Sequence, residues 1–211
     1  VVGTAAGDEL MRPPEPWTEA EGNPVAVDGT PMWQAERLWP EDPAEAAHYK
    51  PLSFQGNAWK ADKHEHAGQP SLAVKNGMVV LSARGPWKGN PGSKIPVLTF
   101  IAPADGLYQL RGQAVASNWG GGNKILLKIV KRLPDNGAVR PVEEFTIPDK
   151  QSQDLSSVEV SLQQGAKLSL IARMAGFHRA GSLELREFAI ARTGDRPDAA
   201  NAAAKVVEKT P

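Results

Sequence analysis

The 211-residue chain contains no cysteine, no excess charge of either sign and no long hydrophobic run. Without cysteine, disulfide bridges, thiolate metal sites and cysteine nucleophiles are excluded together. Because 24 basic residues balance 24 acidic ones, no net charge is available to attract nucleic acid or an anionic membrane surface. No segment approaches the roughly 18 consecutive apolar residues of a transmembrane helix. We therefore predict neither nucleic-acid binding nor membrane insertion.

Glycine and proline are plentiful, with 20 and 18 residues, and 41% of the chain is hydrophobic. This composition supplies a core and many turns but favours few long helices. The length suits a single all-β domain that carries an irregular extension.

Turn signals separate short alternating segments from Ser71 onward. Asn76-Gly77 lies between two apolar runs, a strong hairpin signal because both central residues of a type I′ turn need positive φ. In the segment "LYQLRGQAVA" one parity is apolar and the other polar, which is typical of a strand with one buried face. The apolar parity slips near Arg186 and Glu187, which predicts a β-bulge there. We predict a β-sandwich over residues 71–192.

The two flanks of this region differ from it in composition. Residues 1–70 are rich in proline, glutamate and tryptophan without sustained periodicity, which predicts an irregular arm packed on the core. The opening "VVGTAAGDEL" is consistent with the remnant of a secretory signal peptide or with an ordinary disordered terminus. Residues 193–211 are alanine-rich and predict a short helical or disordered tail that serves as a linker.

The segments "LTFIAPADGLYQLRGQA", "VEVSLQQGAKLSLIAR" and "LELREFAIAR" follow one another in an order that resembles the jelly-roll β-sandwich domains of exported bacterial proteins. Those domains include carbohydrate-binding modules and the accessory domains of glycan-processing enzymes. The resemblance implies a secreted, periplasmic or cell-surface protein, a polysaccharide or oligosaccharide partner and an attached catalytic domain. Many such domains carry an acidic residue after the late glycine turn, where this chain has Ala166 and Lys167. A calcium site is therefore not transferred, and no cofactor is predicted.

Six tryptophans stand out in a chain whose aromatic content is only 6%. Trp87 and Trp119 lie among glycine, asparagine and proline, so we expect them on loops at one end or edge of the sandwich. An indole face there would stack on a pyranose ring while neighbouring polar groups hydrogen-bond its hydroxyls. The alternative is that each indole closes the end of the barrel beneath a glycine turn. The predicted ligand-binding residues are Trp87, Trp119, Asn118, Asn123, Arg84, Lys88 and Asn90.

The other tryptophans and the histidines support different interpretations. Trp33, Trp39 and Trp59 are expected to pin the arm to the sandwich, whereas Trp17 carries no signal. The pair His64 and His66 would project from one face of an extended chain, the spacing of two metal ligands, with His48, His178 or Asp62 as a third. Solvent-facing loop histidines are the alternative, and the predicted site contains no metal.

No catalytic motif is evident. There is no Gly-x-Ser-x-Gly elbow, and Glu143 and Glu144 would point to opposite faces of a strand. We therefore predict no catalytic residues and a non-catalytic carbohydrate-binding or accessory module of an exported glycan-processing or cell-surface protein. The alternatives are a structural or assembly domain without glycan binding, and a histidine-dependent metalloenzyme.

Overall fold

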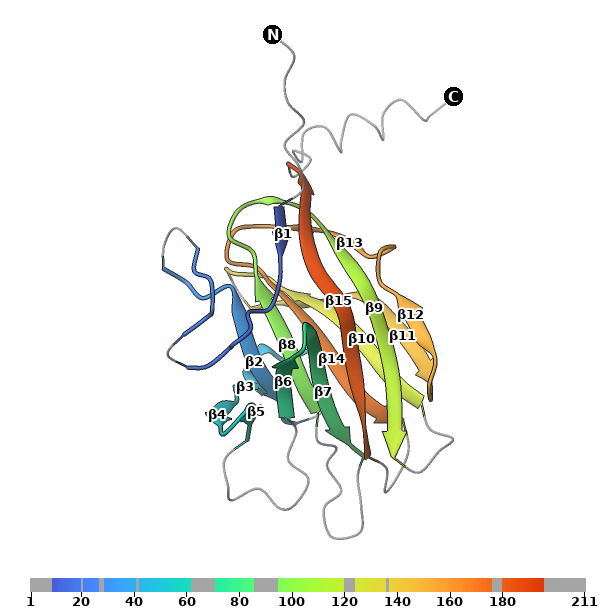
Figure 1. The fold of residues 1–211 in the computed structure, drawn as a ribbon. Helices are drawn as coiled ribbons and strands as arrows, with labels where there is room; N and C mark the ends of the chain where they lie inside the picture. The colour runs from blue at the N-terminus through green and yellow to red at the C-terminus, as the bar shows by residue number, and fades with distance from the viewer. Residues whose placement is uncertain are drawn as a thin grey trace, which may run out of the picture.

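The structure is a computed structural model and describes residues 9–19, 21–26, 29–40, 42–61, 71–85, 95–119, 124–135, 137–175 and 180–195. In these ranges the chain forms fifteen strands and one short 3-10 helix (Figure 1). The strands make two antiparallel sheets that pack face to face, which confirms the predicted all-β sandwich. No helix in the described ranges is long and apolar enough to cross a membrane.

One sheet has nine strands in the order β12-β9-β15-β7-β6-β5-β4, with β1 also pairing with β15 and β13 with β9. The other has six strands in the order β11-β10-β14-β8-β2-β3. The nine strands are β1 (Glu9–Met11), β4 (Ser53–Gln55), β5 (Ala58–Lys60), β6 (Ser71–Lys75), β7 (Met78–Arg84), β9 (Gly106–Trp119), β12 (Ser152–Asp154), β13 (Glu159–Leu162) and β15 (Ala180–Gly194). The six are β2 (Trp33–Leu38), β3 (Tyr49–Pro51), β8 (Ile95–Ile101), β10 (Lys124–Arg132), β11 (Val139–Pro148) and β14 (Lys167–Ala175), and the 3-10 helix is Ala46–His48.

A jelly roll forms the centre of the sandwich. The order β7-β15-β9-β12/β13 in one sheet faces β8-β14-β10-β11 in the other, and the chain alternates between the sheets from β7 to β9 and again from β13 to β15. This is the connectivity of two Greek keys in a double-sheet jelly roll. The strands that make it lie between Met78 and Gly194.

The chain before residue 71 extends both sheets on the same side of the jelly roll. Strands β2 and β3 add to the six-stranded sheet beyond β8, while β5 and β4 add to the other sheet beyond β6. Between Met11 and Trp33 the described residues hold only the isolated bridge between Val25 and Pro31, so this part is the irregular arm that was predicted. From Trp33 onward the prediction of an arm differs from the structure, because β2 is a full partner of β8.

The turn and bulge signals in the sequence correspond to observed backbone geometry. Asn76 and Gly77 have φ of 52° and 70° and join β6 to β7, as a type I′ hairpin requires. The register between β15 and β9 shifts between Arg186 and Ala189, which is the predicted bulge. Within it Glu187 has φ of 51°.

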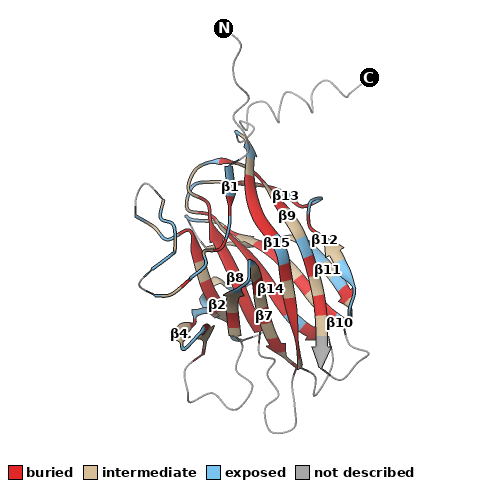
Figure 2. Ribbon diagram, viewed as in Figure 1, coloured by how far each residue is buried: buried red, intermediate tan, exposed pale blue. Residues whose placement is uncertain are grey.

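The main core lies between the sheets, and buried residues occur along the central strands of both (Figure 2). Trp33, Phe100 and Tyr108 form its aromatic centre, with ring centroids 5.2 Å apart for Trp33 and Phe100 and 5.6 Å apart for Phe100 and Tyr108. Trp33 is only 1% exposed. It was predicted to pin the arm, but it belongs to the sheet itself.

A second apolar cluster lies on the outer side of the six-stranded sheet and includes Val97, Val130, Ile171 and Tyr49. The segment that follows β2 folds back over this side, so that Tyr49 is buried and donates its hydroxyl proton to the Pro43 carbonyl at 2.8 Å. Trp39, also expected to pin the arm, is 42% exposed at the start of this segment.

The two tyrosines of the chain predict a loss of stability in alkali. Burial raises the pKa of both Tyr49 and Tyr108 above the ordinary value, so above about pH 10 the unfolded chain loses protons that the native state retains. The free energy of unfolding should fall by up to about 1.4 kcal/mol per pH unit for each tyrosine there. Urea unfolding of the protein and of the Tyr49→Phe/Tyr108→Phe variant, from pH 8 to 11 in small steps, measures the difference. Identical pH profiles would contradict this prediction.

Candidate functional site

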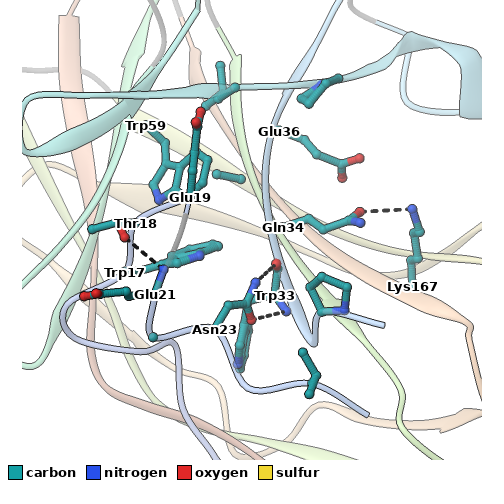
Figure 3. Close-up of a pocket in the computed structure, with 16 residues that line it drawn as sticks. Trp17, Thr18, Glu19, Glu21, Asn23, Trp33, Gln34, Glu36, Trp59 and Lys167 are labelled. Atoms are coloured by element: carbon teal, nitrogen blue, oxygen red, sulfur yellow. Dashed lines mark hydrogen bonds between the residues drawn. The ribbon is translucent and has the colours of Figure 1, made fainter. Parts of the chain in front are cut away.

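A groove of about 610 Å³ opens on the side of the sandwich, where the edge of one sheet approaches the edge of the other (Figure 3). The residues up to Pro31 form one wall, and β2, β5, the end of β3 with Leu52, and the start of β14 form the rest. Its volume falls within the range of about 300–1,000 Å³ that is common for small-molecule sites. The lining residues are Trp17, Thr18, Glu19, Glu21, Gly22, Asn23, Val25, Pro31, Trp33, Gln34, Ala35, Glu36, Pro51, Leu52, Trp59 and Lys167.

Side-chain hydrogen bonds to backbone groups hold the arm that forms the outer wall. The Asn23 amide donates to the Trp33 carbonyl at 2.6 Å and accepts from the Trp33 N–H at 3.1 Å, as a neighbouring strand would. The Glu19 carboxylate accepts from the Phe54 N–H at 3.0 Å. Further along the arm, Glu15 accepts from the two N–H groups of the Asn76-Gly77 turn at 2.8 and 2.7 Å. The wall is therefore held at three positions against both sheets.

Two indoles, Trp17 from the arm and Trp59 from β5, lie close together in the lining of the groove. The Trp59 ring lies 5.3 Å from Trp17 and 5.6 Å from Phe54, measured between centroids. Trp17, on the arm, is only 5% exposed, whereas Trp59 is partly exposed toward the groove. Trp59 thus attaches the arm to the sandwich, as predicted. Its Nε1 atom is buried and makes no hydrogen bond in the described part of the chain.

The floor of the groove carries polar groups from β2 and β14. Lys167 donates from Nζ to the Gln34 Oε1 atom at 3.0 Å, and Glu36 lies two residues further along β2 (Figure 3). Burial lowers the pKa of Lys167, while the nearby Glu36 carboxylate opposes this shift and Arg132 adds to it.

Glu36 is fully engaged in a buried network on the outer side of the six-stranded sheet. Arg132 forms an ion pair with Glu36, and the Thr99 hydroxyl donates to Glu36 Oε2 at 2.5 Å. Arg132 also donates from Nε to the Ser169 hydroxyl at 3.2 Å, and its guanidinium carbon lies 4.0 Å from the centre of the Tyr49 ring. The Arg132 guanidinium thus balances the charge of this carboxylate, and the Thr99 hydroxyl occupies one of its oxygens.

Of the ligand-binding residues predicted from sequence, the structure describes Arg84 and the backbones of Asn118 and Trp119. The backbone of Ala180, at the start of β15, pairs with Arg84 on one side and with Trp119 on the other. The register thus brings these two strand ends to the same end of the sheet, with Asn118 beside Trp119. Arg84 is half-buried there. The side chains of Asn118 and Trp119, and all of Trp87, Lys88, Asn90 and Asn123, lie outside the described residues.

The histidine pair His64 and His66, with Asp62 and His178, also lies outside the described residues. His48 is described, and its Nδ1 atom lies 2.9 Å from the Asp42 carbonyl oxygen. Within the described ranges no three histidine or carboxylate side chains are grouped so that they could hold a metal ion.

Sequence reasoning did not find the groove. Its lining comes from four separate stretches of the chain, and no one of them has a motif. The one signal for it in the sequence is the density of tryptophan before residue 60, which indicates packing of the arm as readily as a binding site.

Searches among known proteins return solved structures only: no family model and no curated protein matches the chain. The xylan-binding domain CBM22-1 from Paenibacillus barcinonensis Xyn10C is 13% identical, with a TM-score of 0.38 over 82% of this chain and 90% of that one. TmCBM61 in complex with β-1,4-galactotriose is 12% identical, with a TM-score of 0.31 over 76% and 88%. Arthrobacter globiformis T6 isomalto-dextranase complexed with panose is 16% identical, with a TM-score of 0.32 over 87% and 34%. At these scores the chains superpose only loosely, and no match assigns a site to this chain.

Proposed function

We propose that this jelly roll is a non-catalytic carbohydrate-binding module and that the groove between the arm and the sheet edges holds the glycan. The observation that carries the proposal is the combination of a partly exposed indole, Trp59, with amide, carboxylate and ammonium groups around one 610 Å³ groove. Carbohydrate needs both components, because a pyranose presents apolar C–H faces and a rim of hydroxyls.

Each group in the groove has a role in this proposal. The exposed part of the Trp59 ring offers a face for a sugar ring. Gln34 and Lys167 on the floor offer donors, and the exposed Glu21 offers acceptors at the rim. So few contacts support affinities of about micromolar to millimolar dissociation constants.

The arm's hydrogen bonds reduce the cost of binding. Asn23 and Glu19 fix the wall to β2 and to Phe54 before any ligand arrives, so a ligand need not order this segment itself. This arrangement suits a preformed surface that binds without chemistry, and the ion-paired Glu36 supports the same interpretation.

A second proposed surface for the same function is the end of the jelly roll at which Arg84 and Trp119 lie, which we call the loop end. The pairing of Ala180 with both Arg84 and Trp119 supports it. This pairing places the start of β15 between the ends of β7 and β9, which are far apart in the sequence. Trp87 and Trp119 would be its stacking groups. Export to the periplasm, cell surface or medium, and attachment to a glycan-processing enzyme, belong to the same proposal.

The Trp59→Ala variant should bind its glycan about tenfold more weakly, because it loses the stacking contact. Affinity electrophoresis against a panel of soluble polysaccharides, followed by titration calorimetry with the retained one, measures this change. Trp39→Ala is the matched control, since Trp39 is exposed and does not line the groove. Circular dichroism checks that each variant folds.

The variants Trp87→Ala and Trp119→Ala distinguish a glycan site in the groove from one at the loop end. Unchanged binding by Trp59→Ala, together with loss of binding by Trp87→Ala or Trp119→Ala, would move the site to the loop end. If the unmodified protein is retained by no polysaccharide, the module proposal is wrong. Self-association in light scattering would then favour a structural or assembly domain.

A further inference from the structure

The carboxylate of Glu19 is held in one place on the wall of the groove. It accepts a hydrogen bond from the Phe54 N–H at 3.0 Å, and Phe54 of β4 is the residue that pairs with Trp59 of β5. Two residues before Glu19, the Trp17 ring lies 5.3 Å from the Trp59 ring, measured between centroids. The wall therefore fixes a negative charge one strand away from the indole on which the proposed glycan would stack.

This charge has no cation beside it in the part of the chain that the structure describes. Glu19 and Glu21 both line the groove and are exposed, and neither carboxylate forms an ion pair with another described residue. The backbone N–H of Phe54 is neutral, so its hydrogen bond orients the Glu19 carboxylate and leaves the charge in place. The side of the groove that carries Trp59 is thus acidic.

The one ammonium group that lines the groove in the described ranges lies on the opposite side. Figure 3 shows Lys167 across the groove from Trp59 and Glu19. The buried Glu36 carboxylate is balanced by Arg132 and adds no net charge there. A polymer with a carboxylate on every sugar ring can bring one carboxylate to Lys167, but the ring that stacks on Trp59 still lies beside Glu19.

We infer that the groove selects uncharged glycans and that Glu19 is the residue that rejects polyuronates, the polymers with a carboxylate on each ring. The inference rests on the proposed function and names the class of glycan that the site takes. Repulsion between like charges in a partly exposed groove should weaken the binding of a polyuronate about fivefold relative to the neutral polymer of the same linkage. The hydroxyls of a neutral sugar meet no such cost, because a carboxylate accepts hydrogen bonds from them.

Matched pairs of polymers test this inference on the full chain. Each neutral polysaccharide of the affinity-electrophoresis panel, with glucomannan, pullulan and laminarin among them, is compared with the same polymer oxidised at C6, where a carboxylate replaces the hydroxymethyl group. A pentose polymer such as xylan is compared with its carboxymethyl ether. Titration calorimetry then gives both dissociation constants for the retained polymer. The neutral form should bind about fivefold more tightly in low salt, and this ratio should approach one in about 1 M sodium chloride, because the salt screens the charges.

The Glu19→Gln variant separates the charge of this residue from its hydrogen bond. The glutamine amide oxygen can still accept from the Phe54 N–H, so the wall should stay in place while the negative charge is lost. The ratio of the two dissociation constants should fall from about fivefold to about twofold, since Glu21 keeps its charge. Glu159→Gln is the matched control and should keep the full ratio, because Glu159 is exposed on β13, at the opposite edge of the same sheet from β5.

The results distinguish this inference from the proposed function. Equal or tighter binding of the carboxylated polymer in low salt would overturn the inference and leave glycan binding intact. An unchanged ratio in the Glu19→Gln variant would also overturn it, because the carboxylate would then take no part in the selection. Retention of no polymer, neutral or carboxylated, would instead contradict the proposed function.

Discussion

Replacing Arg132 with methionine should lower the free energy of unfolding by about 3–5 kcal/mol, the cost of leaving a buried charge without its partner. Arg132 and Glu36 are each 6% exposed, and the carboxylate would keep only the Thr99 hydroxyl as a donor among the contacts described above. Urea denaturation followed by tryptophan fluorescence measures the change.

The double variant Arg132→Met/Glu36→Met separates the charge from the packing. With both charges removed and similar volumes kept, much of the lost stability should return, because apolar side chains can replace a buried ion pair at little cost. If the double variant is as unstable as the single one, the Tyr49 stacking and the Ser169 hydrogen bond contribute more than the charge balance, and our account of the network is wrong.

Replacing Gly112 with alanine should cost about 3 kcal/mol, through a strained backbone and a direct clash. Gly112 has φ of 99° and lies opposite the bulge in β15. A Cβ atom there would lie 2.4 Å from the Arg186 carbonyl oxygen and 2.8 Å from that of Glu187. Because both obstacles are backbone atoms, the bulge itself would have to move.

Gly194→Ala is the matched control for this experiment, since an added Cβ meets no atom within 4 Å and Gly194 is the last residue of the same β15 strand. Its free energy of unfolding should stay within about 0.5 kcal/mol of that of the unmodified protein. Equal stability of the two variants would show that the bulge accommodates a side chain and that its geometry is not fixed by glycine.

The parts of the fold that the sequence predicts are those whose cause is local. The Asn76-Gly77 hairpin follows from two adjacent residues that tolerate positive φ. The bulge near Arg186 follows from a change of apolar parity within one strand. Neither depends on what the rest of the chain does.

Strand β2 could not be predicted in the same way. Its sequence "WQAERL" places Glu36 on a face that is buried, which contradicts the alternation expected of a half-buried strand. The carboxylate is tolerated because Arg132, 96 residues later, lies against it. A single sequence gives no indication of that pairing, so β2 was assigned to the arm.

The groove could not be predicted for the same reason, because contacts between residues distant in the sequence form it. Asn23 meets Trp33 across a loop, Glu19 meets Phe54 from 35 residues away, and Lys167 reaches Gln34 across 133 residues. Predictions from sequence favoured tryptophans next to glycine, which is a local property, and so led to Trp87 and Trp119. The tryptophans that line the groove, Trp17, Trp33 and Trp59, lie instead in segments that only tertiary contacts bring together.

The short strand β1 sets how this domain would respond to mechanical load. Glu9 pairs with Arg192 and Met11 with Ile190, so a pull applied at Glu9 and at the end of β15 separates the two strands from the end where both are held. In this peeling geometry the hydrogen bonds break one after another and not all together, which needs little force. The three-residue strand would detach first, and the tension would then reach Arg12, which donates to the Phe188 carbonyl at 3.4 Å, and the Glu15 carboxylate on its hairpin turn. The domain would lengthen slightly under a weak pull while its jelly roll stayed folded.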